Sequence, residues 1–338
     1  MPVYGAAMAD PTLTYPEAIF IGLLQGVTEL FPVSSLGHSV LIPAVIGGRW
    51  ARDLSLAADQ SPYLAFLVAV HVATAVALVV FFRHDWVRIV KGLATSLRYR
   101  QIATPDQRLA WLLIAATIPV GLAGLALEHT VRTSLGKPVP ASIFLIINGL
   151  LLAGVERLRE RREHGRPVRL ATASEAEERG QVYAASSVRL GAGPQTGVSA
   201  GHTADVDSDR RLAAQSWGQA LTIGAAQILA LLPGVSRSGA TMGAGLLRGL
   251  SHEDAARFAF LLATPVIAAA GVLKLPDLAG PAGHGIIGQV LAGSLVAGIA
   301  AYFSLRFLTR YFETRTLNPF AVYCIVAGIG SLAWVTLH

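Results

Sequence analysis

The sequence predicts an all-α polytopic membrane protein with six transmembrane helices and two re-entrant helix pairs in an inverted repeat. Three observations predict this fold: a hydrophobic composition, several apolar stretches of membrane-spanning length, and two interrupted apolar regions that resemble each other. Of the 338 residues, 53% are hydrophobic and 14% are charged, and the mean hydropathy is +0.53. These values lie outside the usual range of soluble proteins.

Six apolar stretches predict ordinary spans, because a membrane-crossing helix needs roughly 20 mainly apolar residues. Two further apolar regions, 16–47 and 217–249, are interrupted by Pro, Gly and Ser, so each predicts two short helices around a break. The six predicted spans are 62–82, 109–127, 141–155, 257–273, 285–307 and 318–337.

The two interrupted regions are similar in sequence. The segment QGVTELFPVSSLG (25–37) aligns without gaps with QILALLPGVSRSG (227–239), and each copy precedes a short apolar run and three spans. The chain therefore divides into a first half, 1–156, and a second half, 217–338. Three crossings between the copies predict opposite orientations for the two halves, so that the broken helices meet near the membrane midplane.

A polar segment, 157–216, separates the halves. It is rich in Arg, Glu, Ala, Ser and Gly and contains few aromatic residues. Because such a segment buries too little apolar surface to fold alone, we expect a largely disordered cytoplasmic loop. A helix is expected to continue into its start through ERLRERREHGR.

Charge predicts the orientation of the chain. The loops between spans one and two and between spans five and six are rich in Lys and Arg, which predicts that they are cytoplasmic. The loops near Lys137 and Pro281 are poorer in basic residues, so these loops and both termini should face outward. The net charge of +6 fits this topology and anionic headgroups better than nucleic-acid binding. A lone cysteine, Cys324, leaves no disulfide framework or thiolate metal site.

The first break places polar groups inside an apolar region. Gln25 and Glu29 are four residues apart and share a helix face. Glu29 can bind a hard divalent cation or act as a base, and Gln25 can offer a neutral oxygen to the same ion. The alternative for both is hydrogen bonding between helices. That alternative is the expectation for His71 and Asn148, which lie within spans.

Ser35 and His38 are three residues apart and also share a face if this segment is helical. The pair suits a hydroxyl nucleophile beside a base, or a histidine that is protonated or itself phosphorylated. A histidine that only contacts a neighbouring helix is the alternative.

The second break, PGVSRSGAT (233–241), contains Arg237 at membrane depth. An arginine there is costly unless it is paired, and its planar fork matches phosphate oxygens. The helices that start at both breaks point the positive ends of their dipoles at the same place. This predicts an anion-binding site, with phosphate as the expected ligand. The alternative for Arg237 is a buried ion pair with Glu29. Small and hydroxyl-bearing residues at the breaks can cap helices or donate to phosphate: Ser34, Ser236, Ser238, Gly239 and Thr241.

These two motifs resemble those of the bacterial undecaprenyl-diphosphate phosphatase family, the bacitracin-resistance type. That family carries Glu or Gln four residues before Glu, then Pro-x-Ser-Ser-x-Gly-His, and later Pro-Gly-x-Ser-Arg-Ser-Gly-x-Thr. Here they read QGVTELFPVSSLGH (25–38) and PGVSRSGAT. The chain departs from the family by carrying the uncharged option, Gln25, and a longer polar insert after Val155.

The resemblance implies hydrolysis of the terminal phosphate of a polyprenyl diphosphate lipid, assisted by a divalent cation, Mg²⁺ or Ca²⁺. It implies that Gln25 and Glu29 form the acidic, metal-binding pair and that Arg237 grips the diphosphate. Ser35 and His38 become the nucleophile and acid/base candidates. The implied setting is the bacterial plasma membrane, with the bilayer and the lipid as partners and no nucleic acid; a homo-oligomer is compatible with the sequence.

Two other functions are open to a chain of this kind. A transporter or flippase of a polyprenyl phosphate lipid would also use inverted repeats with broken helices. A second lipid phosphatase superfamily shares Pro-Ser-Gly-His and Ser-Arg elements, but it requires a histidine five residues beyond the Ser-Arg pair. The chain reads SGATMGAG after Arg237, without that histidine.

Overall fold

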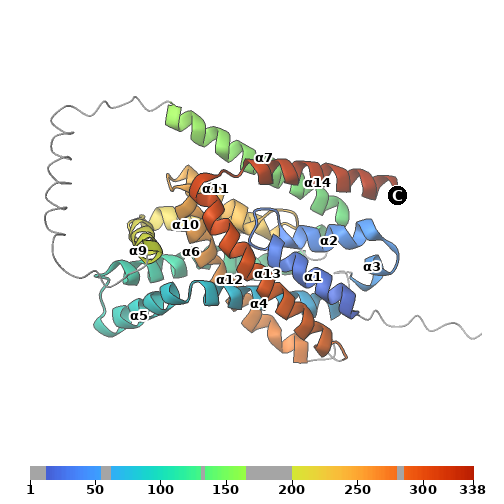
Figure 1. Ribbon diagram of the computed structural model, residues 1–338, viewed down its shortest axis with the longest axis horizontal. Helices are drawn as coiled ribbons and strands as arrows, with labels where there is room; N and C mark the ends of the chain where they lie inside the picture. The colour runs from blue at the N-terminus through green and yellow to red at the C-terminus, as the bar shows by residue number, and fades with distance from the viewer. Residues whose placement is uncertain (1–12, 55–61, 131–133, 165–199, 280–284) are drawn as a thin grey trace, which may run out of the picture.

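The computed structural model is a bundle of α-helices (Figure 1). It describes residues 13–54, 62–130, 134–164, 200–279 and 285–338, and none of these lies in a β-strand. Within those ranges six helices are long and apolar enough to cross a membrane, which confirms the predicted number of spans. They are α4 (Pro62–Phe81), α6 (Pro105–Thr130), α7 (Pro138–His164), α12 (His252–Ala279), α13 (Ile287–Thr314) and α14 (Asn318–Leu337). The protein is therefore a polytopic helical membrane protein.

Shorter helices flank the two predicted breaks. The first break separates α1 (Tyr15–Thr28) from α2 (Ser35–Ile46), which is followed by the one-and-a-half-turn α3 (Gly48–Asp53). The second separates α10 (Trp217–Ala226) and the 3₁₀ helix η2 (Gln227–Leu231) from α11 (Arg237–Leu247). Each break contains a proline, which lacks the N–H needed to continue a helix.

Each helix that leaves a break is capped by a serine. The Ser34 hydroxyl accepts from the Gly37 N–H at 3.2 Å, and the Ser236 hydroxyl accepts from the Gly239 N–H at 3.1 Å. Such caps satisfy backbone donors that a helix start leaves unpaired. Because both caps are buried, water cannot replace them.

The two breaks touch each other inside the bundle. Ser34 also accepts from the Gly234 N–H at 3.1 Å, and its φ of 70° lies where residues other than glycine are uncommon. A Cβ on Gly37 would lie 2.9 Å from the Gly234 Cα, so only glycine fits this approach. Asn148 of α7 bonds both breaks, donating to the Pro32 carbonyl at 3.1 Å and accepting from the Ser236 N–H at 3.0 Å.

Small residues allow the short helices to pack closely on the spans. Gly22 and Gly26 of α1 lie against Gly293 and Ala297 of α13, where added Cβ atoms would meet backbone oxygens at 2.3 Å. In the second half, α10 packs in the same way on α6 through Gly224. Spacing of small residues by four is typical of close helix packing in membranes.

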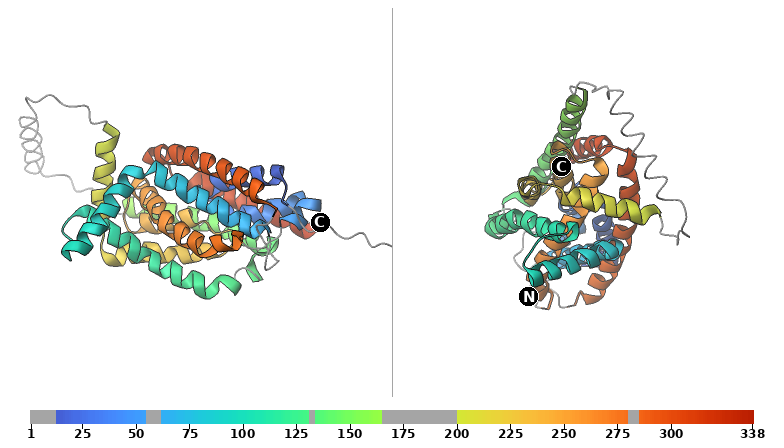
Figure 2. Two further views of the ribbon diagram at one scale, coloured as in Figure 1. Left: turned by 90° about the horizontal axis from the view of Figure 1, so that it is seen from below. Right: turned by 90° about the vertical axis from the view of Figure 1, so that its left-hand side faces the viewer.

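Helix α1 begins and α14 ends at one end of the bundle, while α5 (Arg83–Tyr99) and α9 (Ala200–Ala213) lie at the other end (Figures 1 and 2). Helix α5 was expected only as a basic loop. It is amphipathic, and Ile89, Gly92 and Ser96 lie on its buried face. Helix α5 has fewer apolar residues than the spans, so averaging hydropathy along the sequence does not reveal it.

The polar segment between the halves differs in part from the expected disordered loop. Its first residues continue α7 to His164, as expected, and 200–213 form α9, whereas 165–199 lie outside the described residues. Asp209 of α9 is buried between two guanidinium groups, at 2.5 Å from Arg88 and 2.9 Å from Arg257. These partners are distant in sequence, so the composition of the segment does not reveal them.

Candidate functional site

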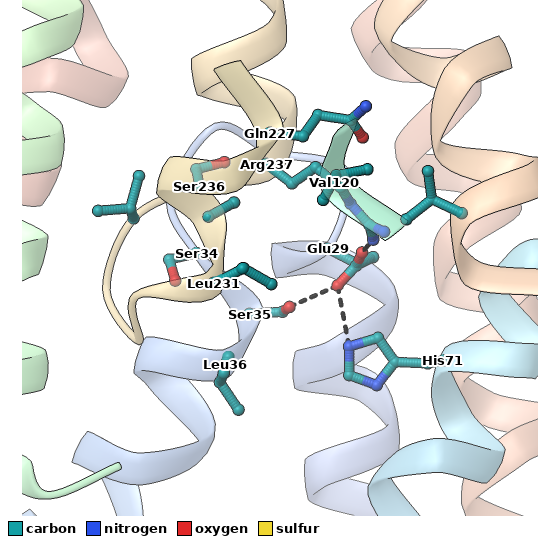
Figure 3. A pocket seen from close by; sticks show the side chains of 13 residues that line it. Glu29, Ser34, Ser35, Leu36, His71, Val120, Gln227, Leu231, Ser236 and Arg237 are labelled. Atoms are coloured by element: carbon teal, nitrogen blue, oxygen red, sulfur yellow. Dashed lines mark hydrogen bonds and ion pairs between the residues drawn. The ribbon is translucent and has the colours of Figure 1, made fainter. Parts of the chain in front are cut away.

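A cavity of ≈ 180 Å³ lies where the two breaks face α4, α6 and α12 (Figure 3). Apolar side chains such as Val120 and Val266 form part of its wall. Its polar lining consists of Glu29, Ser34, Ser35, His71, Gln227, Ser236 and Arg237. Both halves of the chain therefore contribute polar groups to one buried site.

Glu29 is the centre of this site. It follows the last residue of α1 and is only 8% exposed. Its Oε1 forms an ion pair with Arg237 of the other half. Its Oε2 accepts from the Ser35 hydroxyl at 2.5 Å and from the Gln25 amide at 3.0 Å, and it lies 3.3 Å from His71 Nε2. Of the polar groups that the first break was expected to bring together, Gln25 and Ser35 bond the carboxylate, whereas Ser34 and His38 bond other groups.

The positive potential at the cavity has two sources. Ser35 and Arg237 are the first residues of α2 and α11, so two helix N-termini open toward the carboxylate. The Arg237 guanidinium adds a full charge. In this arrangement Glu29 occupies the place that an anionic ligand would take, because it already neutralises the guanidinium and receives the Ser35 hydroxyl.

The other predicted phosphate-binding residues divide into two groups. Ser34 and Ser236 line the cavity, although each hydroxyl also caps its helix. Ser238, Gly239 and Thr241 do not line it. Ser238 donates to the Phe31 carbonyl at 3.1 Å, and Thr241 donates to the Arg237 carbonyl at 2.8 Å. The hydroxyls of Ser238 and Thr241 therefore stabilise the backbone conformation of the second break.

His38 lies away from Ser35, which corrects the expectation that the two side chains form a pair. Its Nδ1 donates to the Ser34 carbonyl at 2.7 Å, and its Nε2 accepts from the Tyr323 hydroxyl at 2.7 Å. It lines a different cavity of ≈ 390 Å³ between α2, α7 and α14. Tyr323 draws the imidazole toward α14, while Ser35 turns to Glu29, so three-residue spacing did not place them on one site.

His71 of α4 and Gln227 of η2 line the cavity, although the sequence assigned neither to the site. For His71 we expected an interhelical hydrogen bond, but its side chain lines the cavity and faces Glu29 (Figure 3). The only signal in the sequence was the presence of an ionisable residue within a span. For Asn148, the expected interhelical hydrogen bond is present, since its amide donates to Cys324 of α14 at 3.3 Å.

The donor set fits a divalent cation. No group of three or more His, Cys, Asp or Glu side chains could hold a metal within the described ranges. Mg²⁺, however, is commonly held by one or two carboxylates together with substrate phosphates and water. Glu29 provides the carboxylate, and the fully buried Gln25 has an amide oxygen, Oε1, without a hydrogen-bond partner among the described residues. An unsatisfied buried oxygen next to a carboxylate suits a cation.

The fold and the site define a polytopic helical membrane protein with a buried charged cavity between two similar helix breaks. The chain belongs to the bacitracin resistance protein BacA family, whose model matches residues 18–330.

Several curated relatives match nearly the whole chain. It is 58% identical to the undecaprenyl-diphosphatase of Mycolicibacterium paratuberculosis, over 96% of this chain and 99% of that protein. It is 53% identical to undecaprenyl-diphosphatase 1 of Frankia casuarinae, over 94% and 97% of the two chains. Undecaprenyl-diphosphatase 2 of Burkholderia orbicola is 39% identical, over 95% and 96%.

Proposed function

We propose that this protein is an undecaprenyl-diphosphatase of the bacterial plasma membrane. It hydrolyses the terminal phosphate of undecaprenyl diphosphate, and the products are undecaprenyl monophosphate and inorganic phosphate. This reaction recycles the lipid carrier of cell-wall synthesis. The names of the relatives and the chemistry of the cavity support the same proposal.

One observation carries the proposal: a guanidinium, a carboxylate and a hydroxyl meet in one buried cavity that two helix N-termini face. Phosphoryl transfer depends mainly on positioning and on neutralising charge at the phosphoryl oxygens. Arg237 and the helix ends supply the positive field, and Ser35 and Glu29 supply a nucleophile and a base. The terminal phosphate displaces Glu29 from Arg237 when it enters.

Ser35 is the nucleophile in this mechanism, because its hydroxyl already donates to Glu29 at 2.5 Å. Its Oγ attacks the terminal phosphorus and its proton passes to Glu29 Oε2. The bond from that phosphorus to the bridging oxygen breaks, and the bridging oxygen keeps the electron pair. The leaving group is a phosphate monoester with a second pKa of about 6, so it departs without a strong general acid.

Water completes the reaction. It attacks the phosphoserine phosphorus, and Glu29 returns its proton to Ser35 Oγ as the Oγ–P bond breaks. Both protons of the water leave on the inorganic phosphate, which departs as H₂PO₄⁻. A divalent cation, Mg²⁺ or Ca²⁺, held by Glu29 and Gln25 together with the diphosphate, would supply further charge neutralisation. His38 bonds the Ser34 carbonyl and the Tyr323 hydroxyl, away from the Glu29 carboxylate, so this mechanism gives it no proton-transfer step.

We also propose that the two halves form an inverted repeat, in which α1 corresponds to α10, α4 to α12 and α6 to α13. The helix contacts support this. Helix α1 packs on α13 as α10 packs on α6, and α4 packs on α13 as α12 packs on α6. The corresponding helices of the two halves, α4 with α12 and α7 with α14, pack directly on each other. Exchanging the halves leaves this pattern unchanged. We therefore propose that α1–α2 and α10–α11 are re-entrant pairs that approach from opposite membrane faces.

Phosphate release from a short prenyl diphosphate by purified protein in detergent tests the function. The wild type should release phosphate without any gradient, and Glu29→Gln should lower kcat by about 10²-fold or more, because it loses the base. Asp207→Asn is a control, since Asp207 is exposed on α9. A chelator should slow the wild type. A protein that releases no phosphate but moves the lipid between leaflets would instead be a transporter.

A further inference from the structure

His71 is held in one orientation relative to Glu29. Its Nδ1 lies 2.7 Å from the Leu67 carbonyl oxygen, which accepts but cannot donate, so Nδ1 carries a proton. In the neutral ring, Nε2 then has no proton and presents a lone pair to the cavity. Metal-binding histidines typically donate their other ring N–H to a backbone carbonyl in this way.

The Nε2 lone pair faces another acceptor. Glu29 Oε2 lies 3.3 Å from Nε2, and two lone pairs at this distance repel each other unless a positive group lies between them. Two ligand atoms that are each about 2.1 Å from one ion are roughly 3.0 Å apart at a right angle and roughly 3.4 Å apart at a tetrahedral angle. The observed separation lies between these values.

Gln25 adds a third donor. Its amide nitrogen lies 3.0 Å from the same Glu29 oxygen, and its Oε1 has no partner although the side chain is fully buried. Turning the amide over exchanges the nitrogen and the oxygen, so that Oε1 takes the position next to Glu29 Oε2. Arg237 binds the other carboxylate oxygen, Oε1 of Glu29, so Oε2, which also accepts from the Ser35 hydroxyl at 2.5 Å, is the oxygen left for a cation.

We propose that His71 Nε2, Glu29 Oε2 and Gln25 Oε1 form a divalent-cation site with one imidazole ligand. This inference rests on the proposed function, because the remaining ligands would be water or the substrate's diphosphate. An imidazole nitrogen favours Mn²⁺ and later first-row metals over Mg²⁺ and Ca²⁺, which prefer oxygen ligands. The site therefore selects a transition metal in preference to the Mg²⁺ or Ca²⁺ implied by the resemblance.

Pulsed electron paramagnetic resonance of bound Mn²⁺ tests the ligand directly. The full chain, purified in detergent without substrate, is loaded with Mn²⁺ alone, and ¹⁴N modulation of the electron spin echo is recorded. The wild type should show coupling to one imidazole nitrogen. His71→Gln should lose this coupling and bind Mn²⁺ at least about tenfold more weakly. Its helical circular dichroism and elution volume should match the wild type.

His38→Gln is the matched control. His38 lies on the neighbouring helix pair and makes the same Nδ1 bond to a carbonyl four residues earlier, but it lines the other cavity. This variant should keep the nitrogen coupling. The proposal is overturned if the wild type binds no Mn²⁺, if bound Mn²⁺ lacks nitrogen coupling, or if His71→Gln retains it.

Phosphate release from the same preparations separates the two ideas. If the wild type hydrolyses a prenyl diphosphate but shows no nitrogen coupling, only the His71 site fails. If nitrogen coupling is present but no phosphate is released with any metal, the proposed function fails and the cation site stands.

Discussion

At the scale of single residues, the site depends on one carboxylate with several partners. Glu29 is buried, and its two oxygens serve different groups: Oε1 pairs with Arg237, and Oε2 receives Ser35 and Gln25. A buried carboxylate needs such partners because the bilayer interior offers no water to solvate it. The ion pair also joins the two halves of the chain, so binding of an anion at Arg237 and contact between the halves are coupled.

The guanidinium of Arg237 should be irreplaceable even by another cation. Arg237→Lys keeps the charge but loses the planar fork that binds two oxygens, so we expect kcat to fall by about 10²-fold or more. Arg248→Lys is the control, because Arg248 is exposed at the other end of α11 and its side chain bonds only Thr222 among the described residues. Phosphate release by the two purified variants checks this. Equal rates would contradict the role of the fork.

A site residue could be predicted where its own segment of sequence marks it, and not where its role depends on a partner from another segment. Glu29 and Arg237 were predictable, because each stands at a helix break in an apolar segment and neither can be buried without a partner. His71 was not, since nothing within α4 shows which neighbour its side chain will meet. The partner of Ser35 was also beyond the local pattern: helix spacing offers His38, whereas the turn at Pro32 brings Glu29 closer.

At the scale of elements, close packing of backbones replaces the hydrophobic effect that holds helices together in water. Helix α1 is too short to span a membrane and must hold Glu29 at depth. Its contact with α13 has glycine on both sides, Gly22 facing Gly293. The position of the carboxylate therefore depends on a helix contact far from the cavity wall.

A single methyl group in this contact should be destabilising. The Cβ of Gly22→Ala would lie 2.3 Å from the Gly293 carbonyl oxygen, so α1 must shift, at a cost of about 1–3 kcal/mol. Gly218→Ala in α10 is the control, because an added Cβ there meets nothing within 4 Å. Thermal unfolding in detergent should show a lower Tm for the first variant and an unchanged or higher Tm for the second. Equal Tm values would mean that α1 can move without cost.

The buried charges around α9 explain why this part of the polar segment is ordered. Asp209 pairs with Arg88 of α5 and Arg257 of α12. Arg211 bonds Asp254 through two nitrogens at 2.8 Å, which raises the pKa of the guanidinium. The sequence predicted the polar composition but not this docking, because ion pairs between distant segments leave no periodic pattern.

Removing the buried carboxylate should release α9. Asp209→Asn leaves the guanidinium groups of Arg88 and Arg257 without this counter-charge, and breaking a buried pair costs about 3 kcal/mol or more. Trypsin should then cleave after Arg210 or Arg211 at least about tenfold faster. Asp207→Asn is the control, since the Asp207–Arg210 pair is exposed and surface pairs contribute at most about 1 kcal/mol. Cleavage at equal rates in both variants would show that Asp209 does not hold the helix.

At the scale of the whole molecule, the two similar halves explain why the site is built from both. Each half contributes one break with a capped helix start, and the breaks meet through Ser34 and Gly234. The six spans were predictable because hydropathy over 20 residues is a property of the chain alone. The inverted orientation of the halves stays a prediction from the repeat, because an odd number of crossings between two copies would reverse their orientation.

The orientation in the membrane can be tested with introduced cysteines, because the native Cys324 is fully buried and should remain unlabelled. Gln101 and Lys137 are exposed at opposite ends of α6. The basic loop that contains Gln101 should be cytoplasmic. An impermeant maleimide should therefore label Lys137→Cys in intact spheroplasts and Gln101→Cys only after lysis, with equal labelling of both in detergent. The opposite pattern would reverse the orientation, and labelling of both from outside would show that α6 does not cross the membrane.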